Sequence, residues 1–294
     1  MPGPPTEDTV RPVEVVLEEL ELPECPRWYD GDLWLVDMWA HEVLRLGPSG
    51  LREAVHRFPD DDPGGIGWLP DGTLLVVGME SRTIHRVEGG RATVHADLRE
   101  VAPFQLNDMV VGHDGVAWVS QFGWDMWGGG SYADTVLVRV SPAGEVAVAA
   151  DEMAVPNGIA VSDDGQTLVV AEPGAGRLSV FSIDGERLVD RRHIQLPKAE
   201  GADLVTPDGI CLDAEGAVWF ADPLGHRVAR VLDGVITDEH AVPDTHPLAC
   251  VLGGPDRRTL YVCTSEQHHK PTRTSTPTGA VRTYEVTVPG EGTP

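Results

Sequence analysis

The stretch SDDGQTLVVAEPGAGRLSVF (162–181) contains the pattern that decides the fold. An acidic residue and a glycine are followed by a short apolar run, a polar break and a second apolar run. Asp-Gly pairs are typical of tight hairpin turns, and alternating Val, Leu and Phe residues are typical of strands. The stretch therefore predicts short antiparallel strands on either side of a turn.

The same pattern occurs six times and spans most of the 294 residues. The turn acid recurs at intervals of 41 to 51 residues, at Asp30, Asp71, Asp114, Asp164, Glu215 and Asp256. Each unit has room for about four short strands, and helical periodicity is nearly absent. Six such units predict an all-β fold, a six-bladed β-propeller, whereas a β-sandwich does not require six copies at this period.

The propeller is expected to form a single domain over residues 23–294. Residues 1–22 either supply a closing strand to the last blade, through VEVVLEELEL (13–22), or are partly disordered at their proline-rich start. Two insertions, 124–134 and 266–278, are predicted to be loops at the rim of the propeller. They are candidate walls for a ligand site, and ordinary surface loops are the alternative.

The composition excludes several classes of partner. There are 47 acidic and 22 basic residues, a net charge of −25, which repels nucleic acid and anionic membrane surfaces and favours a small molecule or a cation. The four cysteines are far apart without a C-x-x-C pair, and no apolar run approaches the roughly 20 residues that span a bilayer. We expect a soluble cytoplasmic protein, either a monomer or a small homo-oligomer.

Known nucleophile and nucleotide motifs are absent from the sequence. It contains no G-x-S-x-G nucleophile motif, no G-x-x-x-x-G-K-[ST] loop and no G-x-G-x-x-G turn between strand and helix. Serine hydrolases and nucleotide-binding proteins are therefore disfavoured.

One register position collects the polar side chains of the repeats. Alignment on the turn places Gly64, Asn107, Asn157, Asp208 and Ala249 seven residues before the turn acid, and Glu24 six residues before it. The strand before this turn is the innermost one in a propeller, so equivalent positions point to a common centre. We call the four oxygen-bearing members the axial quartet: Glu24, Asn107, Asn157 and Asp208.

The axial quartet offers two carboxylates and two amide oxygens. Hard cations such as Ca²⁺ prefer this donor set, whereas Zn²⁺ usually recruits His or Cys. The sequence therefore predicts one divalent cation at the centre, Ca²⁺ first, with Zn²⁺ or Mn²⁺ as alternatives. A purely structural alternative is that Asn157-Gly158 and Asp208-Gly209 form turns at the starts of strands.

Several segments in order along the chain resemble the SMP-30/gluconolactonase/LRE-like family. They are LPECPRW (22–28), LNDMVV (106–111), PNGIAV (156–161), PDGICLD (207–213) and LGGPDRRTLYV (252–262). The resemblance implies a six-bladed propeller with one catalytic divalent ion in its axial channel, and many members hydrolyse lactones. It also implies that the axial quartet holds the metal and that Asp208 acts as the catalytic base.

Substrate-binding residues are expected just beyond the innermost strands and on the rim loops. Members of the family that act on sugar lactones often have Arg at the position of Gln105, and an uncharged amide cannot supply the same charged fork. The predicted substrate contacts are Gln105, Asn107, Phe122, Trp124 and Glu172. Further candidates for the lining are Met38, Trp39, Met79, Gln121 and His268, although Trp and Met on strands are often core residues.

Together these features predict a divalent-metal-dependent hydrolase that opens a lactone, with the metal polarising the carbonyl and a carboxylate activating water. Two alternatives remain at this point. One is a propeller hydrolase of another ester-like or organophosphate substrate. The other is a non-catalytic binding propeller that is stabilised by its metal.

Overall fold

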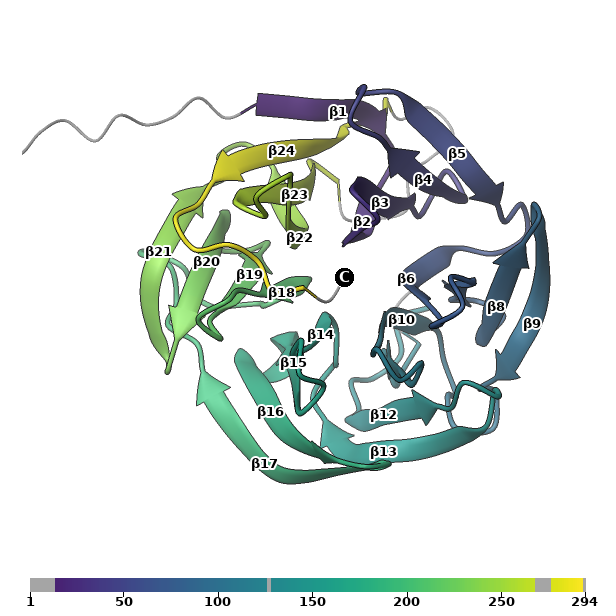
Figure 1. Cartoon of the computed structure of the whole chain (residues 1–294). Helices are drawn as coiled ribbons and strands as arrows, with labels where there is room; N and C mark the ends of the chain where they lie inside the picture. Colours follow the sequence, from purple (N-terminus) through teal and green to yellow (C-terminus); the bar gives the residue numbers. More distant parts are fainter. Residues whose placement is uncertain (1–13, 126–127, 268–275, 293–294) are drawn as a thin grey trace, which may run out of the picture.

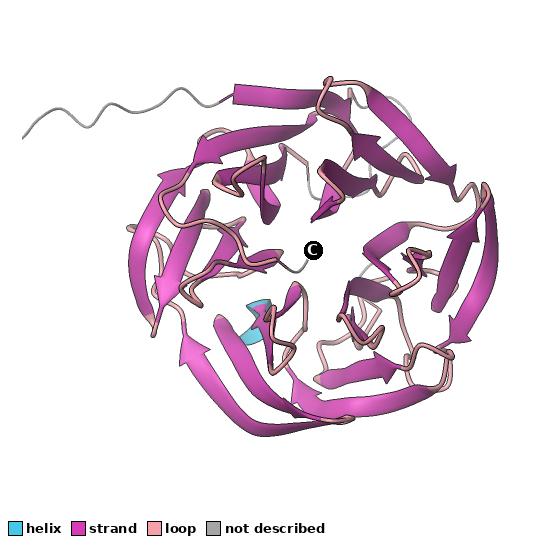
Figure 2. Cartoon of the chain, viewed as in Figure 1, coloured by secondary structure: helices cyan, strands magenta, loops and turns pink. Residues whose placement is uncertain are grey.

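The computed structural model describes residues 14–125, 128–267 and 276–292. Within these residues, six four-stranded antiparallel sheets are arranged around a central axis (Figure 1). The described helical structure consists of one 3-10 turn, Pro173–Ala175 (Figure 2). The predicted six-bladed β-propeller is confirmed. In the part of the chain that the structure describes, no helix is long and apolar enough to cross a membrane.

Each sheet is one blade. In blades 1 to 5 the strands follow one another outward from the axis in chain order, and in blade 6 β1 lies outside β22, β23 and β24. The strands of blades 1 to 3 are β2 (Pro23–Tyr29), β3 (Asp32–Asp37), β4 (Glu42–Leu46), β5 (Arg52–Arg57); β6 (Pro63–Trp68), β7 (Leu74–Gly78), β8 (Thr83–Glu88), β9 (Arg91–Asp97); and β10 (Leu106–Val111), β11 (Ala117–Gln121), β12 (Thr135–Val140), β13 (Val146–Met153). Those of blades 4 to 6 are β14 (Ile159–Val161), β15 (Thr167–Glu172), β16 (Arg177–Asp184), β17 (Arg187–Gln195); β18 (Ile210–Leu212), β19 (Val218–Asp222), β20 (Arg227–Leu232), β21 (Val235–Ala241); and β22 (His246–Gly253), β23 (Thr259–Ser265), β24 (Gly279–Glu285), with β1 (Glu14–Leu20).

The acid–glycine turns join the first and second strands of blades 1 to 5. Their glycines have φ between 68° and 83°, a backbone conformation that side-chain-bearing residues rarely adopt: Gly31, Gly72, Gly115, Gly165 and Gly216. The predicted hairpins are therefore confirmed, and each turn sets the register of the strands that follow it.

The ring is closed by strands from the two ends of the described chain. β1 pairs antiparallel with β24, with Glu14 opposite Thr283 and Leu20 opposite Gly279. The sixth sheet therefore has the order β1-β24-β23-β22. This pairing ties the first blade to the last, so that the sheets can pack around a full circle.

The apolar core lies between neighbouring blades. On β19, Trp219 packs in one cluster with Leu252 of blade 6, whereas the next residue, Phe220, packs in another cluster with Val169 of blade 4. Successive strand residues point to opposite faces, so one strand fills the core on both of its sides. Burying each large apolar side chain contributes roughly 1.5–3 kcal/mol. This packing holds the innermost strands around the axis.

Candidate metal centre

Glu24 and Asn107 lie on irregular parts of their innermost strands. The register between β2 and β3 shifts between Glu24 and Arg27, and the register between β10 and β11 shifts between Leu106 and Met109. Such bulges turn a side chain out of the regular alternation and are common beside active sites. The two bulges therefore point the Glu24 and Asn107 side chains in directions that regular strand pairing would not give them.

Asn157 and Asp208 precede their strands instead of lying on them. Each stands two residues before its strand, β14 or β18, and each donates its backbone N–H to the second strand of the same blade. The Asn157 nitrogen lies 2.9 Å from the Ala171 oxygen, and the Asp208 nitrogen lies 2.9 Å from the Ala221 oxygen. The two residues are therefore held at the inner edge of adjacent blades.

The glycines that follow these residues allow the innermost strands to approach closely. A Cβ atom on Gly158 would lie 2.5 Å from the backbone carbonyl oxygen of Asp208, and one on Gly209 would lie 2.3 Å from the Ala249 Cβ. Neither glycine has a positive φ. Neither pair therefore forms a turn that needs a left-handed glycine.

Negative charge accumulates at the centre without full compensation. Burial raises the pKa of Glu24 well above its usual value, and the charges of Asp208 and Asp108 raise it further. Burial and the charge of Asp108 likewise raise the pKa of Asp208 to about 8. Neither Glu24 nor Asp208 forms an ion pair with a described Arg, Lys or His side chain, whereas Asp108 pairs with Arg27 at 2.8 Å. A divalent cation would offset this charge.

The amide side chains complete a donor set for a hard cation. Asn157 donates a side-chain hydrogen bond to Asp208. Asn107 is buried, and its Nδ2 has no partner in the described part of the chain. The described residues contain no group of three or more His, Cys, Asp or Glu side chains that could hold an ion. A cation at the axis would need the amide oxygens beside the two carboxylates, and such all-oxygen sets suit Ca²⁺.

A cavity of about 210 Å³ opens beside two members of the axial quartet. Its lining is Asn157, Pro173, Thr206, Asp208, Pro223, Leu224, His246 and Leu248. The wall is mainly apolar, with a few polar groups gathered near Asp208, as is typical of small-molecule sites.

His246 is a site residue that the sequence did not point to. It begins β22, and its Nδ1 lies 3.0 Å from the Pro223 carbonyl oxygen. The carbonyl can only accept, so Nδ1 carries the proton and Nε2 is the basic nitrogen of the neutral ring. His246 lies three residues before Ala249, the member of the aligned register position in blade 6. A second alignment of the repeats, three residues upstream of that register position, would have drawn attention to this histidine.

The predicted substrate residues of blade 3 lie outside the lining of this cavity. Gln105 is half-buried, and its Nε2 lies 3.3 Å from a carboxylate oxygen of Glu80. Phe122 is buried and donates its backbone N–H to the Gln105 oxygen. Trp124 is half-buried, with its ring 5.2 Å from that of Tyr132.

The remaining lining candidates are mostly core residues. Phe122 shares one apolar cluster with Met38, Trp39 and Met79, so these three residues pack between blades as the core alternative supposed. Gln121 is also buried, and its Nε2 lies 3.3 Å from the Val101 oxygen. His268 lies outside the described residues.

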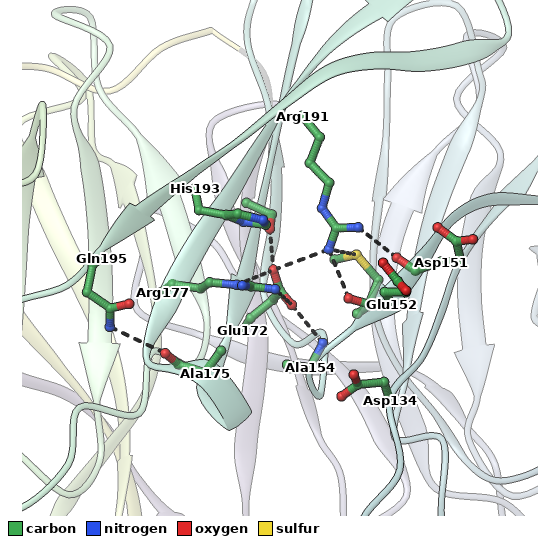
Figure 3. Close-up of polar contacts among 12 residues, drawn as sticks. Asp134, Asp151, Glu152, Ala154, Glu172, Ala175, Arg177, Arg191, His193 and Gln195 are labelled. Carbon is green, nitrogen blue, oxygen red and sulfur yellow. Dashed lines mark hydrogen bonds and ion pairs between the residues drawn. The ribbon is translucent and has the colours of Figure 1, made fainter.

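Glu172 lies inside the blade and not on the cavity wall. Its carboxylate is fully buried and accepts hydrogen bonds from the Ala154 N–H, from Arg177 and from the Ser179 hydroxyl (Figure 3). Its contact with Ala154 is to the loop that leads to Asn157, and a role in substrate binding stays a prediction. A glutamate after an apolar run can end its strand beside half-buried arginines as readily as it can face a channel.

Comparison with known proteins identifies relatives over most of the chain. The sequence model of the SMP-30/Gluconolactonase/LRE-like region matches residues 22–266. The chain is 27% identical to 6-deoxy-6-sulfogluconolactonase of Pseudomonas putida, covering 86% of this chain and 87% of that one. It is 26% identical to pentonolactonase XacC of Haloferax volcanii, covering 85% and 84%.

A solved structure supports the same fold. A calcium-binding protein, regucalcin of Agrobacterium tumefaciens, superposes with a TM-score of 0.79 at 23% identity, covering 95% of each chain. The family match extends over well more than half of the sequence and includes the whole axial quartet. The chain therefore belongs to the SMP-30/gluconolactonase/LRE-like family.

Proposed function

We propose that this protein is a divalent-cation-dependent hydrolase that opens a lactone ring. The observation that carries the proposal is a pair of half-buried carboxylates without an ion-pair partner among the described side chains, Glu24 and Asp208, of which Asp208 lines a cavity for a small molecule. Relatives named as lactonases of sugar acids support the reaction class. Ca²⁺ is the cation that the oxygen donors favour.

The axial quartet would hold the cation, which supplies Lewis acidity toward the carbonyl oxygen of the substrate. Asp208 is the candidate for accepting the proton of the attacking water. Asp208 lines the cavity, where its carboxylate would face the attacking water. Asn157 fixes the orientation of the carboxylate through its hydrogen bond.

The substrate body would lie against Pro173, Leu224 and Leu248 on the apolar wall. Opening the ring requires a proton for the departing alkoxide oxygen, and the Asp208 carboxyl, protonated by the attacking water, would return it there. His246 stands on the same wall. The described lining of the cavity is mainly apolar and contains no Arg or Lys. We therefore propose that the preferred substrate is less polar than an aldonolactone, with a single ring carbonyl.

Acid release from a panel of lactones tests this function. Protein stripped with a chelator is assayed on sugar, aliphatic and aromatic γ- and δ-lactones before and after addition of Ca²⁺, Zn²⁺, Mn²⁺ or Mg²⁺. We expect turnover only with an ion, and the highest kcat/KM on lactones with few hydroxyl groups. Tight ion binding without turnover of any lactone would contradict the hydrolase, and highest kcat/KM on sugar lactones would contradict the proposed specificity.

A further inference from the structure

Buried carboxylates end the second strands of blades 1, 4 and 5. They are 1%, 0% and 0% exposed, and each occupies the last position of its strand. We call them the clamp carboxylates: Asp37, Glu172 and Asp222. Buried acids are costly unless they are hydrogen-bonded or paired, so their partners show what they hold in place.

Each clamp carboxylate accepts a backbone N–H from the segment just before a member of the axial quartet. In blade 4, Glu172 Oε2 lies 2.6 Å from the Ala154 nitrogen, three residues before Asn157. Figure 3 shows this contact together with Arg177 and Arg191, which approach the same carboxylate. Arg177 and Arg191 hold the Glu172 carboxylate in position, and this carboxylate in turn holds the segment at Ala154.

Blades 1 and 5 repeat the arrangement. Asp37 Oδ1 lies 2.8 Å from the Leu22 nitrogen, two residues before Glu24. Asp222 Oδ1 lies 3.1 Å from the Thr206 nitrogen, two residues before Asp208. In three blades, a carboxylate at the end of the second strand thus accepts a backbone N–H from the segment before the quartet residue.

The sequence explains why these segments need an anchor. A proline directly precedes three members of the axial quartet, at Pro23, Pro156 and Pro207. Proline has no N–H to donate to a neighbouring strand, so the chain loses one ladder bond just before the metal-binding side chain. In blades 1 and 5 the clamp carboxylate accepts the N–H of the residue directly before the proline, and in blade 4 it accepts the N–H two residues before the proline.

We propose that the clamp carboxylates are positioning residues for the metal centre. They do not touch the ion or the substrate. They hold the proline-containing segments so that the carboxylate and amide oxygens of the quartet stay gathered at the axis. This inference rests on the proposed function for the metal itself, whereas the anchoring of the segments can be measured without any metal.

Blade 5 offers a matched pair of variants. Asp222 and Asp213 are both fully buried and both pair with an arginine, Arg227 at 3.2 Å and Arg230 at 2.6 Å. Asp213 holds the hairpin at the other end of β18, where its Oδ1 accepts the Glu215 and Ala217 N–H groups. Asp213→Ala therefore removes a comparable buried ion pair without touching the segment that carries Asp208.

The experiment measures Ca²⁺ affinity by competition with a chromophoric chelator, and amide hydrogen exchange of residues 204–210 in metal-free protein. We expect Asp222→Ala to weaken Ca²⁺ binding at least tenfold and to accelerate exchange in this segment. Asp213→Ala should leave affinity within about twofold and exchange there unchanged. Asp222→Asn keeps an oxygen for the Thr206 N–H and should recover most of the affinity.

Two results would overturn the inference. One is equal loss of Ca²⁺ affinity in Asp222→Ala and Asp213→Ala, which would mean a general effect of lower stability. The other is unchanged exchange of residues 204–210 in Asp222→Ala; should that variant not fold, unchanged exchange of residues 20–22 in Asp37→Ala would overturn the inference in the same way. Failure of the parent protein to bind Ca²⁺ would instead refute the proposed metal centre, and the exchange data would still decide whether Asp222 anchors the segment.

Discussion

The inner strand of blade 5 has an aspartate at each end, and the surroundings of the two carboxylates differ. Asp208, just before β18, lines a cavity, and burial together with Asp108 raises its pKa to about 8. Asp213, just after β18, is fully buried but pairs with Arg230 at 2.6 Å. The two lie five residues apart, roughly 16 Å along an extended chain.

The difference distinguishes the charge of Asp213, which the protein itself pairs, from the charge of Asp208, which a bound ligand could pair. An acid that is paired with arginine and bonded to turn N–H groups has its charge satisfied by the protein. Asp208 has an amide partner and negatively charged neighbours, so the folded protein disfavours its ionised form. Strongly perturbed acids in a cavity are typical of functional sites.

The sharpest way to break this comparison is to neutralise each aspartate in turn. Asp208→Asn should lower kcat/KM by at least about 100-fold, the scale of losing a positioned base, and should leave metal-free stability unchanged or higher because a repelled charge is gone. Asp213→Asn should lower the free energy of unfolding by about 3–5 kcal/mol, because Arg230 loses its buried partner. Urea denaturation in EDTA and lactone turnover measure both quantities.

The comparison fails if both variants lose stability equally. It also fails if Asp213→Asn loses turnover per folded molecule as severely as Asp208→Asn does. Turnover is therefore normalised to the folded fraction under each condition.

The fold could be predicted because its signals are local and repeated. The acid–glycine turns require positive φ, and the alternating apolar runs follow them at a nearly constant interval, so six weak signals support one architecture. The approach of Glu24, Asn157 and Asp208 to one another follows from the same repeat, since one register position recurs in successive blades, and their role as metal ligands stays a prediction.

The surroundings of the quartet could not be predicted because they depend on contacts between segments that are distant in sequence. Glu172 resembles a channel residue until Arg177, Arg191 and the Ala154 N–H are seen around it. His246 becomes part of a site only when blade 6 is placed beside blade 5. Neither outcome follows from periodicity, because each depends on which neighbour fills the space next to a strand end.

The pH dependence of stability gives a second, smaller effect. The folded-state pKa values of Glu24 and Asp208 are raised, so the metal-free fold binds more protons than the unfolded chain between about pH 4 and pH 8. The stability that comes from these bound protons is complete below the pKa values of the two groups in the unfolded chain. It is lost as the pH rises through their pKa values in the folded protein. The free energy of unfolding in EDTA should fall toward pH 8, by up to about 1.4 kcal/mol per pH unit for each group.

Saturating Ca²⁺ should remove most of this fall, since the ion replaces the protons. Asp208→Asn provides the control, because it removes one titrating group of the pair and leaves the other in place. Parallel curves for the parent protein and Asp208→Asn in EDTA would show that Asp208 titrates at an ordinary pKa.

The smallest effect concerns the wall of the cavity at Asp208, where two histidines provide a matched test. The rings of His226 and His246 lie 4.9 Å apart, and each Nδ1 is near a backbone carbonyl oxygen, but His246 lines the cavity and His226 does not. His246→Gln should lower kcat/KM about tenfold, a contribution of about 1.4 kcal/mol to transition-state binding, with Ca²⁺ affinity unchanged. His226→Gln should change kcat/KM less than twofold. Equal effects of the two substitutions would mean that the ring pair supports the loop, and that the chemistry at the Asp208 end is carried by the axial quartet without help from the wall.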